Sequence, residues 1–590
     1  MAVWSALSHT HARTHIHTHS YGHFDEKVGD IMVVSARSWL TNEGGKHLVL
    51  MMWLGANSWL FVKTFLMYSG GQQYHYLYKM LGLGLCISRA SASVLNLNCS
   101  LVLLPMCRTL LTFVRGTHMV SSRKTRRLLD KSKTFHVACG VAICIFSVVH
   151  VSAHLVNVVN FSRSYSEDFP ALNFARYKGE DPTLIILTTV PGITGVLLVV
   201  ILFLMFTSSS YCVRIYNYEI FWYTHNLFII FYIILMVHMV GGALKYQTNI
   251  EAHAPGCLRA NHSSAEQRGE DLDKREEEEM RCKAEAHFQS HCPQTWLWVS
   301  GPLCLYCAER LYRYIRSSDP VTIVTVIRHP CDVIELRMLK KNFKARPGQY
   351  IVLNCPNVSS FENHPFTLTL CPTENKETFA VHLRVVGDWT ERFTQLLLPD
   401  IRRDMDILPV VHQRTYPKLY VDGPFGSPSE EVFNYDVSLC VAGGIGVTPF
   451  ACVLHALLDG WTGLRLKRLY FVWVCRELQS FYWFAELLCA LHHKLWHENR
   501  PDYFNLKLYV SQSDNLQCLS EEKYRPLASR LLVGRPKWKL LLHDIGRTNK
   551  HKRVGVFCCG PKGISRTLHR LCNSAQFPGT TFEFNKESFS

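Results

Sequence analysis

The chain has 590 residues, of which 48% are hydrophobic and 19% are charged, and its formal net charge is +16. This composition excludes a disordered, fibrous or small disulfide-stabilised protein, and the length predicts several domains, because one core rarely exceeds about 300 residues. The mean hydropathy of +0.03 averages two different halves, since the long apolar stretches all come before about Ile315. The sequence therefore predicts a membrane half followed by a water-soluble half.

The chain begins with a histidine-rich segment. Its histidines alternate with Thr, Ala and Ser at positions His9, His11, His15, His17, His19 and His23. Such a tract can bind metal, and the segment lacks the apolar core of a signal peptide. We interpret residues 1–37 as a disordered His-rich extension.

Six apolar stretches follow, each close to the roughly 20 residues that a helix needs to cross a bilayer. They are His47–Met67, Leu81–Val114, Phe135–Val158, Leu184–Phe206, Ile220–Gly241 and Thr295–Ile315. The second is too long and is expected to be trimmed or tilted. We therefore expect residues 38–316 to form an all-α, six-helix transmembrane bundle.

A strongly basic connection separates the second and third stretches. It holds Arg115, Arg123, Lys124, Arg126, Arg127, Lys131 and Lys133 against one acid, Asp130. Loops rich in Lys and Arg stay cytoplasmic, so we expect both the N-terminus and the C-terminal half to be cytosolic. Because this position explains the charge, we expect no nucleic-acid partner. The basic loop is instead placed to contact the cytosolic half or anionic membrane lipids.

The loop after the fifth stretch is acidic and lies on the opposite, non-cytosolic side in this topology. It contains Cys257, Cys282 and Cys292. A disulfide suits that compartment, but the sequence does not set its pairing. Glycosylation sequons begin at Asn160 and Asn261 on the same side.

Two pairs of histidines lie within apolar stretches. The third stretch holds His136 and His150, 14 residues apart, and the fifth holds His225 and His238, 13 residues apart. These separations span about 21 Å and about 19.5 Å of helix, so each helix offers one histidine near either side of the membrane. A lone membrane histidine usually hydrogen-bonds a neighbouring helix. Two depth-matched pairs favour two b-type haems, an inner one held by His136 and His225 and an outer one held by His150 and His238. Thirteen residues leave an angular offset of about 140°, so the fifth stretch needs a π-bulge or an oblique haem.

Two more residues lie near the outer pair. Arg89 sits toward the outer end of the second stretch, and His154 follows His150 by four residues on the same helix face. Arg89 either snorkels to the interface as a structural residue or pairs with a haem propionate or another anion. His154 is expected beside the outer haem without ligating it.

After Ile315 the pattern changes to short β-rich runs separated by Gly, Pro and Asp. An apolar strand from Leu439 runs into a glycine turn and a helix begins near Pro449, an arrangement that holds a pyrophosphate at the helix N-terminus. Arg476 follows the next strand and is placed to bind the 2′-phosphate of NADPH. Further strands are expected at Arg468–Val474, Leu506–Val510 and Val554–Cys559, in a parallel α/β sheet with ligands at its carboxyl edge.

These features resemble the NADPH oxidase family of flavocytochromes b. The resemblance runs from about Ser38 to Ser590 and rests on motifs in family order: the paired histidines, His364-Pro-Phe-Thr367, Val381–Trp389, Asp422–Ser427, Gly443–Phe450 and Phe557–Pro561. It implies a cytosolic module like ferredoxin reductase. That module comprises an FAD-binding β-barrel over residues 317–428 and a Rossmann-like NADPH-binding lobe over residues 429–590.

The resemblance also implies roles for individual residues. Those matching the flavin site are His364, Pro365, Phe366, Thr367, Arg384, Gly387, Trp389 and Thr390. Those matching the NADPH site are Gly444, Gly446, Thr448, Pro449, Arg476, Cys559, Gly560 and Pro561. Phe589 matches an aromatic residue that covers the flavin, although Ser590 follows it here. Arg89 and His154 match the oxygen site, and His253 matches a loop histidine that donates a proton and favours release of hydrogen peroxide over superoxide.

The expected function is therefore a transmembrane NADPH oxidase that passes electrons from cytosolic NADPH through FAD and two b haems to oxygen. The resemblance implies a small membrane light-chain subunit as partner and an endoplasmic reticulum or plasma membrane location. A ferric or cupric metalloreductase of the same architecture remains the main alternative. A transporter with a nucleotide domain does not account for the paired histidines, and the intact motifs disfavour an inactive structural partner.

Overall fold

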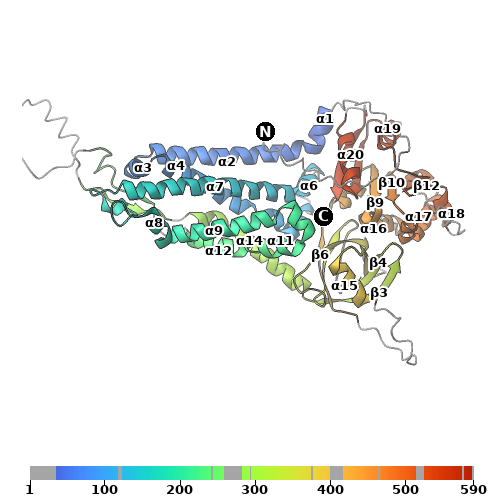
Figure 1. The fold of residues 1–590 in the computed structure, drawn as a ribbon. Helices are drawn as coiled ribbons and strands as arrows, with labels where there is room; N and C mark the ends of the chain where they lie inside the picture. Colours follow the sequence, from blue (N-terminus) through green and yellow to red (C-terminus); the bar gives the residue numbers. More distant parts are fainter. Residues whose placement is uncertain are drawn as a thin grey trace, which may run out of the picture.

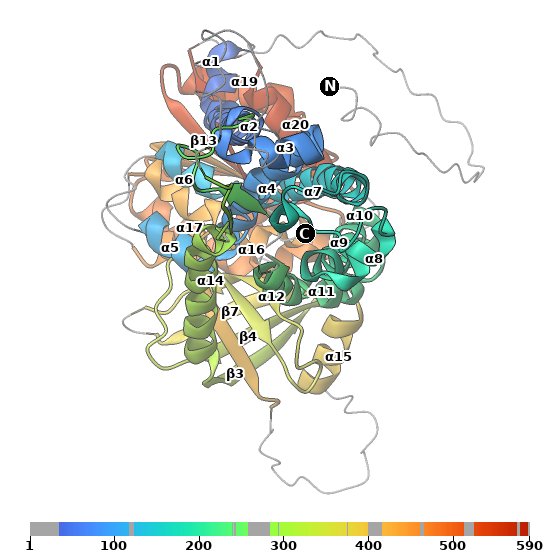
Figure 2. The ribbon, with the colours of Figure 1, turned by 90° about the vertical axis from the view of Figure 1, so that its left-hand side faces the viewer.

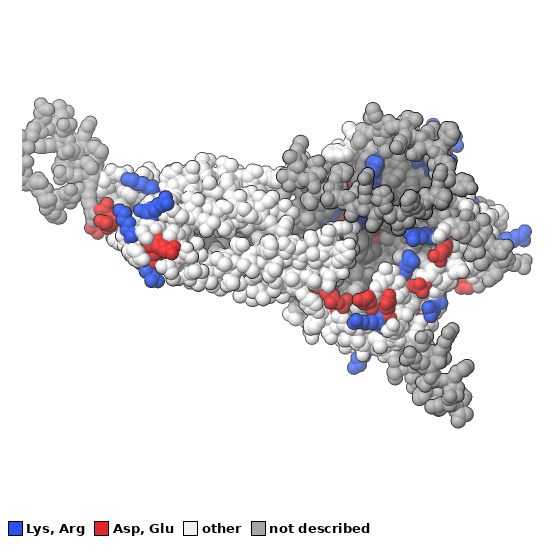
Figure 3. All heavy atoms as spheres, in the orientation of Figure 1, with Lys and Arg blue, Asp and Glu red and all other residues white. Residues whose placement is uncertain are grey.

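The computed structural model describes residues 35–116, 123–238, 240, 244–257, 282, 284–292, 294–373, 376–398, 416–460, 465–512, 524–574, 577 and 579–587. The histidine-rich start, the Asn261 sequon and Phe589 lie outside these ranges. A long helical shaft occupies one end of the molecule and a mixed α and β region the other (Figure 1). On the face seen in Figure 3, charged side chains gather at the two ends of the shaft and leave its middle uncharged.

Within the described residues, five helical segments are long and apolar enough to cross a membrane, so the chain is a multi-pass membrane protein. They are Ala36–Gly70, Leu83–Met106, Ser132–Arg163 (α7), Val190–Ser208 (α9) and Tyr218–His238. The first comprises α1 (Ala36–Trp39), a π-helical turn at Leu40–Gly44 and α2 (Gly45–Gly70), and the second comprises α4 (Leu83–Leu101) and a 3₁₀ turn at Leu104–Met106. The last comprises α11 (Tyr218–His225) and α12 (Phe228–His238). The expected sixth span is also a helix, α14 (Thr295–Ser317), which runs along the same bundle (Figure 2). Its C-terminal half carries Glu309, Arg310, Arg313 and Arg316, which makes it more polar than the five.

The overlong second stretch is divided rather than tilted. Helix α3 (His75–Leu81) ends at Gly82, whose φ of +61° only glycine adopts readily. Helix α4 then ends before Pro105, which lacks the N–H that would continue the helix. The remainder forms a separate amphipathic helix, α5 (Arg108–Gly116).

The fifth stretch is interrupted directly after His225. The Leu227 N–H donates to the Thr224 carbonyl and the Ile229 N–H to the Asn226 carbonyl, both at 3.2 Å. These are three-residue spacings, so the turn is tightened rather than widened, and the expectation of a π-bulge is wrong. A tightened turn rotates about 120° per residue instead of about 100°, which brings His238 toward the face of His225.

The first unit of the C-terminal half is a closed six-stranded barrel, formed by β3 (Pro320–His329), β4 (Val333–Leu339), β5 (Tyr350–Asn354), β6 (His364–Leu370), β7 (Thr378–Arg384) and β8 (Leu419–Phe425). The strand order around it is β3-β4-β7-β6-β5-β8. Helix α15 (Asp388–Leu397) follows β7 and buries Trp389, Phe393 and Leu397 against the barrel core.

The second unit is a parallel sheet with helices on its faces. Its strands are β9 (Val437–Gly443), β10 (Arg468–Cys475), β11 (Phe504–Val510), β12 (Leu531–Val533), β13 (Arg553–Cys559) and β14 (Thr581–Glu587), and its main helices are α16 (Thr448–Leu458), α17 (Ala485–His497), α19 (Trp538–Thr548) and α20 (Lys562–Cys572). The order β12-β11-β10-β9-β13-β14 reverses direction between β9 and β13. Ligands of such sheets bind at the carboxyl ends of the strands where the order reverses.

Ion pairs join the membrane half to both units of the C-terminal half. The basic loop and its short helix α6 (Arg123–Leu129) supply Arg115 and Arg126, which pair with Glu431, and Arg127, which pairs with Glu583. The expectation that this loop contacts the C-terminal half is therefore confirmed. At the end of α14, Arg313 and Arg316 pair with Asp422 of β8 at 2.7 and 2.5 Å.

Candidate functional site

The structure brings membrane histidines of different helices together. The ring centroids of His136 (α7) and His225 (α11) are 6.2 Å apart. The His154 ring lies 4.5 Å from that of His150. His136 and His225 therefore lie near the N-terminal end of α7, and His150 and His154 lie farther along it.

In all four histidines the Nδ1 atom has a partner. His136 bonds the Val102 carbonyl at 2.8 Å and His150 the Ser88 carbonyl at 3.0 Å. His238 bonds the Thr194 hydroxyl at 2.8 Å and His225 the Ser209 hydroxyl at 3.3 Å. Because carbonyl oxygens only accept, and both hydroxyls already donate to helix carbonyls, each Nδ1 carries the proton. Each Nε2 is then the atom free to bind a metal, as in metal sites whose second ring nitrogen is fixed by an outer partner.

Two further observations fit haem between these helices. Gly140 is one turn from His136 on α7, and a Cβ placed there would meet no atom within 4 Å, so there is open space beside it. Arg89 has a buried Nε without a hydrogen-bond partner among the described residues, and its guanidinium lies 5.7 Å from the Tyr68 ring centroid. A propionate or another anion would satisfy that unpartnered donor.

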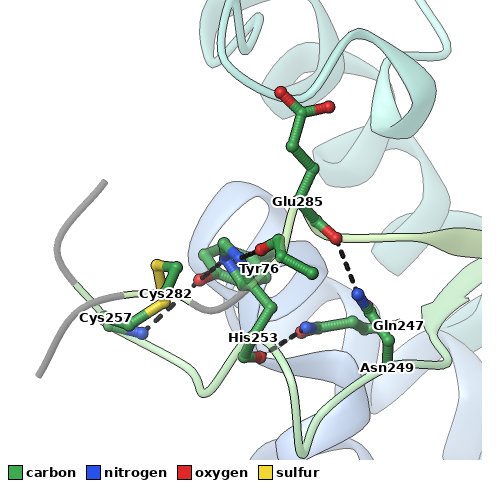
Figure 4. Close-up of a disulfide and its surroundings, with 9 residues drawn as sticks. Tyr76, Gln247, Asn249, His253, Cys257, Cys282 and Glu285 are labelled. Atoms are coloured by element: carbon green, nitrogen blue, oxygen red, sulfur yellow. Dashed lines mark hydrogen bonds between the residues drawn. A yellow bond between two sulfur atoms is a disulfide. The ribbon is translucent and has the colours of Figure 1, made fainter. Parts of the chain in front are cut away.

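A small cap follows the fifth stretch, and Figure 4 shows its disulfide beside Tyr76 and His253. A hairpin of β1 (Lys245–Gln247) and β2 (Phe288–Ser290) and a disulfide between Cys257 and Cys282 organise this cap, while Cys292 is a free, exposed thiol. His253 is 6% exposed, and its Nε2 and Nδ1 bond the Tyr76 hydroxyl and the Ala284 carbonyl, both at 2.9 Å. Its ring also lies 6.1 Å from that of Phe169, and none of its described contacts is with Arg89 or His154.

The sequon at Asn160 lies inside α7. Its side-chain amide donates to the Leu81 carbonyl at 2.9 Å, so the atom that would carry a glycan is engaged in packing. Glycosylation of this chain stays a prediction, since the second sequon lies outside the described residues.

The flavin-strand residues gather on one side of the barrel. The His364 ring lies 4.1 Å from that of Trp389 and the Phe366 ring 6.3 Å from it. The buried Trp389 Nε1 has no partner among the described residues. Pro365 is in the same strand, β6, and Arg384 ends the adjacent strand of the barrel, β7.

The segment after Arg384 leads directly into α15. Gly387 has φ +136° and no atom within 4 Å of an added Cβ. The Thr390 hydroxyl accepts from the Val386 N–H at 2.9 Å and donates to the Gly387 carbonyl at 2.8 Å. Open space, a glycine backbone and a helix N-terminus together fit an FAD phosphate.

The glycine turn after β9 meets the turn after β13. Gly444 has φ +56°, and Thr448 and Pro449 begin α16. A Cβ on Gly446 would collide with the Cys559 carbonyl, and one on Gly560 would lie 2.9 Å from the Gly443 backbone. Only glycines allow this approach, which brings Cys559, Gly560 and Pro561 to the reversal point of the sheet.

One hydrogen bond joins residues predicted for the two nucleotide sites. The Thr367 hydroxyl of β6 donates to the Thr448 hydroxyl of α16 at 2.7 Å, so the strand predicted to bind flavin is in direct contact with the start of the helix after the glycine turn. Arg476 is exposed directly after β10, the strand beside β9.

Sequence reasoning missed the residues that orient the histidines. Thr194 and Ser209 belong to the fourth stretch and to its end, and Ser88 and Val102 to the second. Their spacing along the chain carries no sign of the contact. The one available signal is a hydroxyl residue within the otherwise apolar α9.

Sequence reasoning also missed Glu587 in β14. Burial raises the pKa of its carboxyl from 4.5 to about 7, although hydrogen bonds from Ser429 and Ser427 lower it. A folded-state pKa above the unfolded one contributes stability below pH 4.5 that is lost as the pH rises through about 7.

Glu587→Gln is therefore expected to stabilise the C-terminal half above pH 7, by up to about 3 kcal/mol. The amide keeps an acceptor for both serines but carries no charge. Thermal unfolding followed by flavin fluorescence from about pH 5 to about pH 8 measures the effect. Glu498→Gln, at a side chain that is 42% exposed, is the control. Parallel pH profiles for wild type and Glu587→Gln would contradict the prediction.

Comparison with known proteins identifies the chain. Three family models match it: a ferric reductase-like transmembrane component over residues 92–236, an FAD-binding domain over 318–429 and a ferric reductase NAD-binding domain over 435–573. It is 63% identical to NADPH oxidase 4 of Pongo abelii and 62% identical to that of Homo sapiens, in both cases over 95% of this chain and 100% of the relative. NADPH oxidase 3 of Homo sapiens is 36% identical over 93% of this chain and 99% of the relative. Together with flavin and nucleotide sites that touch each other beneath a multi-pass membrane bundle, these matches place the chain in the NADPH oxidase family, as a transmembrane oxidoreductase that binds FAD and uses NADPH.

Proposed function

We propose that His136 and His225 hold the inner of two b haems and that His150 and His238 hold the outer one, so that cytosolic NADPH drives reduction of oxygen on the far side. The observation that carries this proposal is the common orientation of the four imidazoles, each with Nδ1 fixed and Nε2 free. Ordinary membrane histidines use either nitrogen for helix contacts, so four identical assignments at two depths support metal ligation.

When bound, FAD converts a hydride into single electrons, and the haems provide the electron path across the membrane. The protein's own residues bind NADPH and FAD and orient them relative to each other. The Gly444–Val447 turn and Thr448 hold the NADPH pyrophosphate, and Arg476 holds the 2′-phosphate. Trp389, His364 and the Gly387–Thr390 segment hold the flavin and its phosphates. Cys559, Gly560 and Pro561 line the nicotinamide edge.

The oxygen site is proposed beside the outer histidine pair, at Arg89 and His154. His150 and His238 would hold the outer haem, which would supply electrons to oxygen bound beside it, near Arg89 and His154. A guanidinium there stabilises negative charge that develops as oxygen is reduced. His253 lies farther out, bonded to Tyr76, where it can relay a proton toward released superoxide and favour peroxide.

Two measurements test this function. A reduced-minus-oxidised spectrum of the purified chain should show low-spin b haem, and a featureless spectrum would remove the electron path. NADPH-dependent peroxide formation, compared with reduction of ferric or cupric chelates, then separates the oxidase from the metalloreductase. Faster metal reduction than oxygen consumption would favour the alternative.

The assembly and boundaries follow from the same reasoning. We place the domain divisions at residues 1–37, 38–316, 317–428 and 429–590. The second boundary falls at the last residue of α14 and the third in the 3₁₀ helix that follows β8. In this topology both ends of the chain face the cytosol, and the Cys257–Cys282 cap faces the lumen of the endoplasmic reticulum or the exterior. The proposed partner is a small membrane light-chain subunit. Protease protection of the cap in sealed vesicles and co-purification with the light chain test these assignments.

Thr194→Val is expected to weaken the outer site without removing a ligand. Valine is close in shape but cannot accept the His238 Nδ1 proton, so the ring loses its fixed orientation. Loss of such an outer partner costs 10- to 100-fold in metal affinity, roughly. Haem content and the midpoint potential of the outer haem measure the effect. Thr188→Val, at an exposed hydroxyl bonded to its own helix, is the control, and equal haem loss in both variants would contradict the prediction.

A further inference from the structure

Three strands of the FAD barrel bring two histidines and a carboxylate together. His329 ends β3, Glu335 lies in β4, and His382 lies in β7 directly opposite Glu335 in the strand pairing. The Glu335 Oε2 atom lies 3.1 Å from His329 Nε2 and 3.7 Å from His382 Nε2. All three candidate ligand atoms lie within 4.8 Å of one another.

One ring nitrogen of His382, at the centre of this cluster, has no hydrogen-bond partner among the described residues. Its ring is 6% exposed, its Nδ1 lies 2.9 Å from the Thr369 hydroxyl, and its Nε2 has no hydrogen-bond partner among the described residues. If Nδ1 donates to Thr369, then Nε2 points a lone pair at the carboxylate, and two electron-rich atoms face each other in a buried site. If Nε2 carried the proton, 3.7 Å would be too long for a hydrogen bond.

The donor set suits a divalent cation. Imidazole nitrogen and carboxylate oxygen are ligands that zinc binds in proteins, and the three candidate atoms lie close enough together to reach one ion.

The spacing also matches a tetrahedral site. Zinc binds histidine nitrogen and carboxylate oxygen at about 2.0–2.2 Å, which places neighbouring ligand atoms about 3.3 Å apart. The two measured separations from Glu335 Oε2 lie on either side of that value. The outer partners are present as well, since Thr369 bonds His382 and Arg337 Nε bonds the other oxygen of Glu335 at 2.5 Å.

We propose that His329, Glu335 and His382 form a binding site for a divalent transition metal, with zinc as the best match and a water molecule as fourth ligand. The site lies where the barrel meets the NADPH lobe. The His382 ring is 4.5 Å from that of Phe484, and the Trp483 indole donates to the Pro330 carbonyl at 2.8 Å. Arg384 follows His382 by two residues on the same strand. A bound ion therefore fixes the strand that leads to the flavin phosphates against the lobe that delivers NADPH.

The experiment uses the full-length chain in nanodiscs, with FAD and haem loaded. The histidines of the N-terminal tract are all replaced by alanine, because that tract could bind zinc itself. After chelation and dialysis against buffered zinc, elemental analysis should give one zinc per chain, counted separately from haem iron. His329→Ala and Glu335→Gln should each reduce bound zinc more than tenfold. His543→Ala, at an exposed histidine on α19, should leave it unchanged.

X-ray absorption at the zinc edge supplies a second test that haem iron does not obscure. Two imidazole ligands with oxygen completing the shell support the site, whereas sulfur ligands place the zinc elsewhere and overturn it. FAD content and flavin-fluorescence melting confirm that the variants fold, and zinc should raise the melting temperature of the background chain but not of Glu335→Gln. Zinc content that is equal in the background, His329→Ala and Glu335→Gln overturns the proposal, as does a background chain that binds none.

Discussion

His150→Leu is expected to abolish NADPH-driven oxygen consumption while leaving FAD content and NADPH-driven reduction of a soluble dye at wild-type levels. Leucine is apolar and suits a membrane helix, but it offers no ligand atom. Removing a ligand should cost more than the roughly 100-fold that loss of an outer partner can cost. Because the FAD-binding and NAD-binding domains lie in the C-terminal half, away from His150, FAD content and dye reduction should not change.

The control for this variant is His47→Leu. His47 is also a histidine of a membrane helix, but its Nδ1 bonds the Glu43 carbonyl of its own helix at 2.9 Å and it has no counterpart among the paired histidines. Haem spectra, oxygen consumption and dye reduction are measured side by side. Substantial oxygen consumption by His150→Leu would show that electrons reach oxygen by another route.

Asp422→Ala is expected to weaken the contact between the transmembrane bundle and the barrel and so to lower the stability of the protein. One carboxylate pairs with both Arg313 and Arg316, and its side chain is 12% exposed. Its loss leaves Arg316 without its ion pair and leaves Arg313 with only the longer 3.9 Å contact to Glu309 at the junction of α14 and β8, and breaking a buried pair costs roughly 3–5 kcal/mol. The variant should therefore unfold at lower temperature and lose oxygen reduction more than dye reduction, because the barrel is no longer held against the bundle.

Asp436→Ala is the matched control. Asp436 also pairs with an arginine, but that partner, Arg465, is 60% exposed. Exposed pairs contribute at most about 1 kcal/mol, so its melting temperature and its ratio of oxygen to dye reduction should stay near wild type. Similar losses in Asp422→Ala and Asp436→Ala would show that the junction does not depend on the buried pair.

Local sequence patterns predicted the helices, turns and strands, because these elements are determined mainly by residues close together in the sequence. The apolar stretches, the glycine turn before α16 and the strands near Arg468, Leu506 and Val554 all formed close to their expected positions. The pairing of His136 with His225 was predictable as well, because helix rise converts sequence separation into depth.

Other features depend on contacts that sequence spacing does not encode. The Cys257–Cys282 pairing is one, because loop closure costs change little with loop length. The approach of Gly446 to Cys559 is another, since it requires β9 and β13 to be neighbours although more than a hundred residues separate them. A loop histidine such as His253 is normally exposed, and only the folded cap shows that it is buried.

The contacts of Asn42 close the chain from its first helix to its last strand. Its side-chain oxygen accepts from Arg127 at 2.8 Å and from the Phe584 N–H at 2.9 Å, and its nitrogen donates to Asn573 at 2.8 Å and to the Phe582 carbonyl at 3.0 Å. Each polar atom of a residue that is 5% exposed is thereby satisfied. During synthesis the first helix enters the membrane long before residues 573–584 leave the ribosome. The Asn42 side chain therefore lacks these hydrogen-bond partners until residues 573–584 have been synthesised. A chain truncated before β14 would leave the Asn42 amide without the partners from Phe582 and Phe584.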